Sequence, residues 1–120
     1  MAAWVAAGGE LTAEVSKAEK GKLDFKLDLS RVAKVDWLKG ELKSDNVKII
    51  DSRGSRYYDG SAVGGHPRGG HLPGSRSIPY SLIVDENNKL KTNDELKKLF
   101  TEAGVKRYDT VVTYLSLIHI

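Results

Sequence analysis

Short apolar segments along the chain predict two strands, and a third segment shows weaker strand signals. Residues 47–50 and 111–114 are apolar runs rich in β-branched side chains, which is typical of buried strands. Residues 77–80 are the weaker candidate, because Pro79 cannot donate a ladder hydrogen bond and favours an edge or a strand end. Helical patterns separate the first two runs, so we expect crossover connections. The sequence therefore predicts an α/β fold with a mostly parallel sheet and flanking helices.

The clearest helix is predicted to begin after Thr92. Thr92 and Glu95 have the spacing of a capping box, and Gly104 stands where the helix would end. The apolar residues of this helix recur at intervals of three and four positions: Leu96, Leu99, Phe100 and Ala103. A shorter amphipathic helix is predicted between Ser30 and residues 44–46. Its apolar positions are Val35, Leu38 and Leu42.

The N-terminal part of the chain shows three different patterns. Residues 1–9 are small and apolar up to Gly8 and Gly9, which predicts the last turns of a helix. Residues 10–22 are polar without a sustained period and predict a linker. Residues 23–29 alternate apolar and charged side chains, so we expect an extended segment with one face buried.

A loop rich in glycine and proline is predicted between residues 52 and 76, because this stretch has almost no large apolar side chains. A loop of that length inside a small domain is usually functional or mobile. It begins where the strand 47–50 ends, and ligands of α/β folds bind at the carboxyl ends of strands. We therefore expect the functional residues of the chain in this loop.

Composition excludes several kinds of chemistry. The chain has 120 residues, enough for one small domain or a piece of a larger one, and it contains no cysteine. Disulfides, thiolate zinc sites and cysteine-based catalysis are therefore excluded for this sequence. The net charge of +3 comes from basic residues interspersed with acidic ones, so nucleic acid is not a favoured partner. No run reaches the roughly 20 apolar residues of a membrane helix, and the absence of a recognisable secretory signal favours a cytoplasmic location.

Four arginines lie in the loop or at its ends: Arg53, Arg56, Arg68 and Arg76. Their guanidinium groups could converge on an oxyanion, because the planar fork pairs two N–H donors with a sulfonate, phosphate or carboxylate. The alternative is structural, with Arg53 in a salt bridge to Asp51 or bonded to a backbone carbonyl and the other arginines solvated. From spacing alone, the structural alternative is the more favoured.

The loop also contains two histidines, His66 and His71. A metal site would need further ligands, which the sequence does not place at any recognised spacing. The glycine pairs near them precede neither a Gly-Lys-Ser/Thr motif nor a helix, so a phosphate-binding loop is only weakly indicated. His71 lies in a turn with glycine and proline, and we expect its imidazole to hydrogen-bond back to the strand that carries Asp51. A structural role for His71 is favoured over a catalytic one.

Five blocks of the sequence resemble the rhodanese family in order and in spacing: residues 49–53, 68–75, 78–80, 91–100 and 111–114. They are most similar to the second, catalytic domain of tandem-domain thiosulfate or 3-mercaptopyruvate sulfurtransferases. The resemblance implies an incomplete rhodanese-like domain within a fragment of a longer parent protein. It divides the chain into the helical end of a preceding rhodanese-like domain (1–9), an interdomain linker and extended segment (10–34), a partial C-terminal rhodanese domain (35–114) and a tail unlike the family (115–120).

Members of this family move a sulfane sulfur from thiosulfate or 3-mercaptopyruvate to a thiophilic acceptor such as cyanide. A cysteine directly after the strand that corresponds to residues 111–114 carries the sulfur as a persulfide. That position is Leu115 here, and residues 115–120 contain no glycine to form the loop that surrounds the persulfide. The resemblance therefore implies sulfurtransferase ancestry without activity in this chain, and we expect that cysteine at position 115 alone would not restore it.

The resemblance also implies roles for individual residues of the loop. Substrate binding falls to Arg56 and Arg53, and organisation of the loop to Asp51, His71 and Arg68. Arg56 stands one residue closer to Asp51 than the donor-binding arginine of the family does. Either Arg56 serves after a one-residue deletion, or Tyr57 occupies the position. The resemblance implies no metal and no cofactor.

The implied partners are a small anionic sulfur donor and the N-terminal rhodanese domain of the same parent chain, with neither nucleic acid nor membrane. The alternative function is a non-catalytic rhodanese-like module that binds anions or a protein through Arg53, Arg56 and Arg68. A cysteine-dependent phosphatase of the same fold is not supported, because the sequence has neither the cysteine nor the arginine downstream of it.

Overall fold

The computed structural model describes residues 2–26 and 28–115, which divide into two compact units. The first unit is Met1–Val32 and the second is Ala33–Ile120. Residues 116–120, most of the predicted tail, lie outside the described part of the chain. No helix within the described residues is long and apolar enough to cross a membrane.

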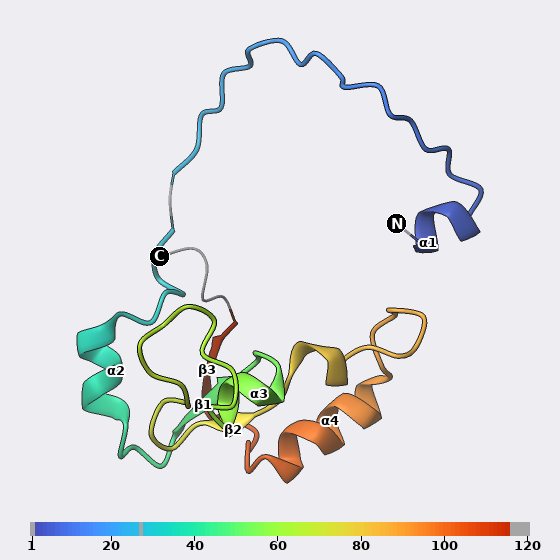
Figure 1. Ribbon diagram of the computed structural model, residues 1–120. Helices are drawn as coiled ribbons and strands as arrows, with labels where there is room; N and C mark the ends of the chain where they lie inside the picture. Colours follow the sequence, from blue (N-terminus) through green and yellow to red (C-terminus); the bar gives the residue numbers. More distant parts are fainter. Residues whose placement is uncertain (1, 27, 116–120) are drawn as a thin grey trace. The chain divides into compact units, whose positions relative to one another are not determined.

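The second unit is built on a parallel sheet of three strands, β1 (Val47–Asp51), β2 (Arg76–Ser77) and β3 (Thr110–Tyr114). The spatial order is β2-β1-β3, so β1 is the central strand (Figure 1). β1 and β3 pair along their whole length, from Val47 opposite Thr110 to Asp51 opposite Tyr114. Parallel pairing confirms the α/β class predicted from the apolar runs and the helical patterns between them.

Helix α4 (Asn93–Glu102) follows the predicted signals closely. The Thr92 Oγ1 accepts a hydrogen bond from the Glu95 N–H at 3.4 Å, and the Thr92 N–H donates to the Glu95 carboxylate at 2.9 Å, which is a complete capping box. Gly104 ends the helix with φ of +84°, a left-handed conformation that favours glycine. The predicted shorter helix is also confirmed as α2 (Val35–Glu41).

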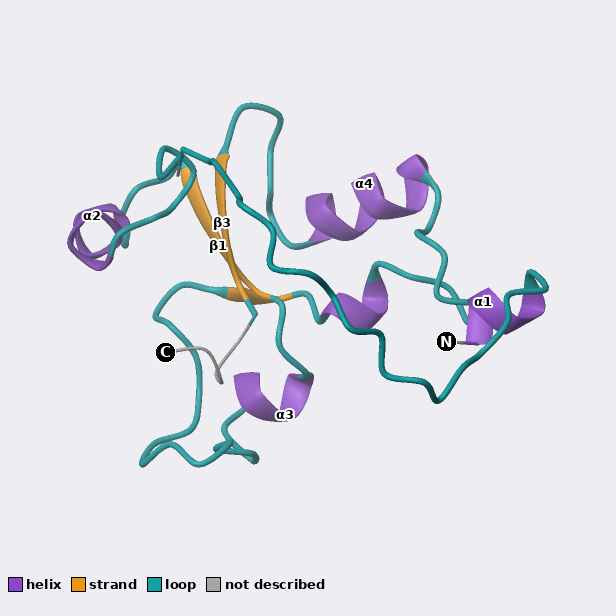
Figure 2. Cartoon of the chain, turned by 90° about the horizontal axis from the view of Figure 1, so that it is seen from above, coloured by secondary structure: helices purple, strands orange, loops and turns teal. Residues whose placement is uncertain are grey.

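The predicted loop between residues 52 and 76 contains one further helix. α3 (Ser55–Tyr58) is a single turn that follows the carboxyl end of β1 (Figure 2). The predicted strand 77–80 is wrong in extent, because β2 ends at Ser77 and a 3₁₀ helix, Tyr80–Leu82, begins just after Pro79. Proline has no N–H for a sheet ladder, which explains why regular pairing stops there.

The core of the second unit is centred on β1. Among the described residues, the buried hydrophobic side chains are Ile49, Ile50 and Ile78. The Ile78 N–H donates to the Asp51 carbonyl at 2.9 Å, so the chain after β2 stays bonded to the end of β1. The central strand therefore carries both the core and, at its carboxyl end, the start of the candidate site.

The first unit begins with helix α1 (Ala2–Ala6), and Gly8 follows it with φ of +80°. This confirms the predicted helix end at the glycine pair. The predicted burial of one face of residues 23–29 is wrong, because Leu23 is 80% exposed and Phe25 is 68% exposed. Alternation shows that a segment suits a sheet, but burial also needs a partner surface, which the pattern does not reveal.

Candidate functional site

The candidate site lies at the carboxyl ends of β1 and β3, where the chain leaves β1 through a long loop. Asp51 and Tyr114 are opposite each other in the sheet. The Ser52 N–H donates to the Tyr114 carbonyl at 2.9 Å, which extends the pairing by one residue. The start of the loop is thus fixed against the end of the strand that precedes Leu115.

Asp51 and Arg53 form a buried ion pair at this point. Arg53 Nη2 lies 2.6 Å from Asp51 Oδ2, and Arg53 Nε lies 2.9 Å from Asp51 Oδ1. The Arg53 backbone N–H also donates to Asp51 Oδ1 at 3.0 Å. The residue Asp51 is fully buried and Arg53 is 9% exposed, so solvent screens this pair little. Two parallel N–H donors on one carboxylate make it a strong and directional contact.

The ion pair determines the protonation of both groups. Burial raises the pKa of Asp51, but the hydrogen bonds from the Arg53 side chain and backbone outweigh it and hold the pKa below its ordinary value. The hydrogen bond to Asp51 raises the pKa of Arg53 further above its already high value. Both side chains are therefore charged in neutral solution.

Arg53 also connects the strand end to the middle of the loop. Its Nη2 donates to the Gly70 carbonyl at 2.7 Å and, more weakly, to the Tyr57 carbonyl at 3.4 Å. The guanidinium carbon lies 5.2 Å from the centre of the Tyr114 ring and 5.8 Å from that of Tyr57, distances typical of cation–π contacts. These contacts agree with the structural interpretation of Arg53, in which it pairs with Asp51 and bonds a backbone carbonyl.

His71 does not reach the strand that carries Asp51, so the predicted hydrogen bond is wrong. Its Nδ1 lies 2.7 Å from the Tyr58 carbonyl, and the two rings stack with centres 3.8 Å apart. The Tyr58 hydroxyl in turn donates to the Ser75 carbonyl at 2.9 Å. The reason is α3, which the sequence pattern did not predict and which places Tyr58 next to the histidine.

Tyr114 is a site residue that the sequence reasoning missed. Its hydroxyl accepts a hydrogen bond from the Leu72 N–H at 3.2 Å and lies 3.3 Å from the Ser75 Oγ. Burial, the largest effect, raises the pKa of Tyr114, so the phenol stays protonated. The sequence did contain a signal for this residue, because tyrosine is the last residue of a predicted strand and ligands of α/β folds bind where strands end.

The structure separates the remaining arginines from the buried pair. Arg56 lies in α3 and is exposed, as are Arg68 in the glycine-rich part of the loop and Arg76 at the start of β2. None of the ion pairs between described residues involves these three arginines. The four arginines therefore do not converge on one site. Arg53 is the one whose side chain forms a buried ion pair.

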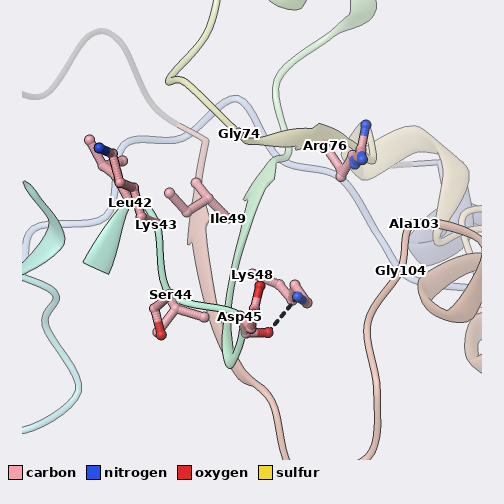
Figure 3. Close-up of a pocket in the computed structure, with 11 residues that line it drawn as sticks. Leu42, Lys43, Ser44, Asp45, Lys48, Ile49, Gly74, Arg76, Ala103 and Gly104 are labelled. Carbon is pink, nitrogen blue, oxygen red and sulfur yellow. Dashed lines mark hydrogen bonds between the residues drawn. The ribbon is translucent and has the colours of Figure 1, made fainter. Parts of the chain in front are cut away.

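A pocket of about 240 Å³ lies elsewhere on the second unit (Figure 3). It is lined by the start of β1 and by Ala103 and Gly104 after α4, together with the basic residues Lys43, Lys48 and Arg76. Lys48 Nζ donates to the Asp45 carbonyl at 2.6 Å within it. Of the four arginines considered for binding an oxyanion, Arg76 alone lines this pocket, and Asp51, Arg53, Arg56, Arg68 and His71 do not.

Within the described part of the chain, no group of three or more His, Asp or Glu side chains is placed to hold a metal ion. His66 and His71 therefore belong to no metal cluster of described residues. The chemistry available at the candidate site is that of hydrogen-bond donors and charged groups.

Together, the parallel sheet, the crossover helices and the loop at the carboxyl ends of the strands define an α/β domain with its candidate site at the sheet edge. The sequence matches the Rhodanese-like domain family over residues 34–116. The chain belongs to this family, and the resemblance found in its sequence blocks is confirmed.

Several relatives of the chain are named as sulfurtransferases. A thiosulfate sulfurtransferase of Gallus gallus is 26% identical over 102 residues, which are 85% of this chain and 35% of the relative. A mitochondrial thiosulfate/3-mercaptopyruvate sulfurtransferase of Arabidopsis thaliana is 33% identical over 73 residues, 59% of this chain and 19% of that protein. The chain therefore spans well under half the length of these relatives.

A similar solved structure is the crystal structure of SseA from Escherichia coli, described with the rhodanese fold of 3-mercaptopyruvate sulfotransferases. The TM-score is 0.77 with 26% identical residues, over 94% of this chain and 42% of SseA. The fold of the chain is thus a rhodanese fold, here with three parallel strands among the described residues.

Proposed function

We propose that this chain derives from a sulfurtransferase that moves sulfane sulfur from thiosulfate or 3-mercaptopyruvate to a thiophilic acceptor such as cyanide, and that the 120-residue chain does not itself catalyse the transfer. The observation that carries the proposal is the residue after β3. β3 ends at Tyr114, against the loop held by Asp51 and Arg53, and the next residue is Leu115.

The transfer needs a thiolate. A thiolate attacks the outer sulfur of thiosulfate, the S–S bond of the donor breaks, and sulfite leaves with the electron pair. Cyanide then attacks the outer sulfur of the persulfide, which gives thiocyanate and returns the thiolate. Leucine has no nucleophilic atom, and the sequence has no cysteine at any position. A serine hydroxyl does not form a persulfide, so Ser52 or Ser75 is no substitute.

We assign organisation of the loop to Asp51, Arg53 and His71. The support is geometric, because the Arg53 guanidinium bonds both the Asp51 carboxylate and the Gly70 carbonyl. His71 holds the same part of the loop to α3 through Tyr58. An arginine with these partners has few donors left for a substrate anion, so substrate binding by Arg53 is the weaker part of the assignment.

We assign the contact with the anionic donor to Arg56. Arg56 is exposed on α3, in the loop that begins at the strand end, and forms no ion pair with a described residue. A guanidinium can present two N–H donors to a sulfonate or carboxylate oxygen pair. Arg68 lies in the same loop and is also exposed.

The alternative is a non-catalytic rhodanese-like module that binds an anion or a protein. It is favoured by one observation: the ion pair of Asp51 and Arg53 and its bond to Gly70 are complete although the sequence has no cysteine. A loop ordered in this way can bind an anion without catalysis. Where the module binds an anion, both proposals share Arg56 as the contact and differ in what the parent chain does with the anion.

We also propose that α1 belongs to a preceding rhodanese-like domain of the same parent chain, with residues 10–34 as the connector. The similarity to SseA supports this, because it extends over 94% of the chain and so beyond the family match at residues 34–116. The preceding domain is then the intramolecular partner.

The test of the anion site is a thiosulfate titration followed by ¹⁵N-resolved NMR. We expect amide shifts in α3 and in the loop after it, and a roughly three-fold weaker binding for Arg56→Gln, the size expected for an exposed charge contact. The matched control is Arg31→Gln, which removes an exposed arginine of the first unit. Equal effects of the two substitutions would show non-specific charge attraction and contradict the assignment of Arg56.

A further inference from the structure

The pocket of Figure 3 has no part in the proposed function. Its volume is about 240 Å³, and all the residues that line it belong to the second unit. It lies beside the first half of β1, because β2 pairs only with Ile50 and Asp51. The turn before β1, the chain at Gly74 and the end of α4 form its other walls. The pocket is therefore a concave surface at the amino-terminal half of the central strand.

Lys48 is an unexpected residue on the central strand of a parallel sheet. Such a strand is covered on both faces and is normally apolar throughout, and Val47, Ile49 and Ile50 follow that rule. Lys48 is half-buried, and its Nζ donates to the Asp45 carbonyl at 2.6 Å. This single bond leaves further N–H donors of the ammonium group for a ligand. A cation held in this position favours a ligand of negative charge.

The neighbouring strand supplies a second cation on the same face of the sheet. Arg76 is opposite Ile50 in the register of β1 and β2. Residues opposite each other project from one face, as do residues two apart on a strand, so Lys48 shares this face with Arg76. Figure 3 shows both side chains on the side of β1 that faces Gly104. Neither forms an ion pair with a described residue, so an anion between them would remove their mutual repulsion.

The lining of the pocket carries more positive than negative charge. Lys43 is the third basic residue of the lining, but it points away from Lys48 and Arg76 in Figure 3. It therefore adds to the positive field of the pocket without a contact. Asp45 is the one acidic residue of the lining, and it is exposed, so solvent screens its charge. The pocket as a whole attracts anions.

We propose that this pocket binds a small phosphate monoester, with Lys48 and Arg76 as the contacts of its phosphate group. A phosphate monoester carries about two negative charges in neutral solution, which matches two cations on one face. The planar guanidinium of Arg76 can bind two phosphate oxygens, and the ammonium of Lys48 acts as a point charge. The pocket is smaller than the roughly 300–1,000 Å³ typical of drug-sized ligands, so the organic part has only a few carbon atoms.

This site is independent of sulfur transfer. The pocket lies at the first half of β1, whereas the ion pair of Asp51 and Arg53 lies at the carboxyl end of the strand, followed by Arg56 in α3. The two anion sites share no residue. Binding at one can therefore fail in experiment without any effect on the other.

The first test locates and identifies the ligand by ¹⁵N-resolved NMR of the full chain at constant ionic strength. The probes are glycerol 3-phosphate, inorganic phosphate and malonate. We expect glycerol 3-phosphate to shift the amides of Val47, Gly74 and Gly104 and to leave those of α3 unchanged. Malonate should bind more weakly, because its two charges lie on separate carboxylates.

Each probe has an outcome that decides the proposal. Tighter binding of glycerol 3-phosphate than of inorganic phosphate supports a phosphorylated small molecule, and equal binding of the two would overturn the organic part. Equal binding of malonate, or shifts spread over the whole surface, would show attraction by charge alone and overturn the site.

The second test removes the two cations one at a time. Lys48→Gln and Arg76→Gln should each weaken the binding of glycerol 3-phosphate about ten-fold, the size expected for a hydrogen bond to a charged group. Arg76 is exposed, so its substitution does not endanger the fold, and Lys48→Arg should retain most of the affinity because it retains the charge. The shifts that thiosulfate causes in α3 should be the same in Lys48→Gln as in the unaltered chain.

The matched control is Lys89→Gln, which removes an exposed lysine of the same unit outside the pocket. Its affinity for glycerol 3-phosphate should equal that of the unaltered chain. An unchanged affinity in Arg76→Gln, or the same loss in Lys89→Gln as in Lys48→Gln, would overturn the proposal.

Discussion

At the residue scale, the ion pair of Asp51 and Arg53 determines how the chain leaves the central strand. Its two charges are buried, and Arg53 extends the contact to the Gly70 carbonyl, 17 residues further along the chain. The pair thus closes the loop that carries the other arginines of the candidate site. Removing one partner leaves the other charge buried without compensation, which is costly.

Asp51→Asn tests this role through the free energy of unfolding. We expect a loss of about 3 kcal/mol, the size found for a broken buried ion pair. The pKa of Asp51 is lowered in the folded chain, so on acidification the unfolded chain binds the proton first. The stabilisation is therefore complete above about pH 4, the ordinary pKa of an aspartate, and is lost as the pH falls through the lower folded pKa.

Urea denaturation between neutral and acid pH measures both effects. Asp51→Asn should lower the stability at neutral pH and flatten its acid dependence. The control is Asp36→Asn, at an exposed carboxylate whose contact with Lys39 is 3.8 Å long and contributes little. If the free energy of unfolding of Asp51→Asn depended on acid pH as that of the unaltered chain does, the stabilising role of this ion pair would be contradicted.

Sequence reasoning identified part of the site at this scale. The salt bridge between Arg53 and Asp51 was one of two alternatives, because residues two apart at a strand end are able to meet. Tyr114 and Ser75 were missed, since their contact depends on how the loop returns to the sheet and spans 39 positions of sequence. The partner of His71 was wrong for the same reason, because Tyr58 is brought to it by tertiary packing.

At the element scale, prediction succeeded where local signals agree. α4 has a capping box, an apolar face and a glycine at its end, and each of these is visible in the sequence. α3 was missed because a single turn of four residues in a glycine-rich loop has no periodic pattern to detect. The alternation of residues 23–29 predicts an extended segment with one buried face, but its described residues form no strand, and burial depends on a partner that a pattern does not reveal.

Thr92→Ala tests the capping box of α4. The substitution removes the acceptor of the Glu95 N–H and the hydrogen bond that the Thr92 hydroxyl donates to the Glu95 carboxylate, so we expect a loss of about 1 kcal/mol. Hydrogen exchange of the first-turn amides should become faster. Thr101→Ala is the control, because that hydroxyl only bonds the Lys97 carbonyl within the helix and alanine has the higher helix propensity. Equal loss in both variants would exclude a specific capping effect.

At the scale of the whole molecule, the chain combines a rhodanese-like domain with an N-terminal unit described separately from it. The family match begins at residue 34, next to the start of the second unit at Ala33. Only three hydrophobic residues among those described are buried, so the core that supports the candidate site is small. The predicted division of the chain into parts of two rhodanese domains stays a prediction, as does the proposed absence of catalysis.

The most direct test of the account is thiocyanate formation by the purified chain. The chain is mixed with thiosulfate and cyanide, and thiocyanate is measured against buffer alone and against an active thiosulfate sulfurtransferase. Because position 115 holds leucine and the sequence has no cysteine, we expect thiocyanate at the buffer level at every concentration of the chain. Thiocyanate formation that rises in proportion to the chain would contradict the account.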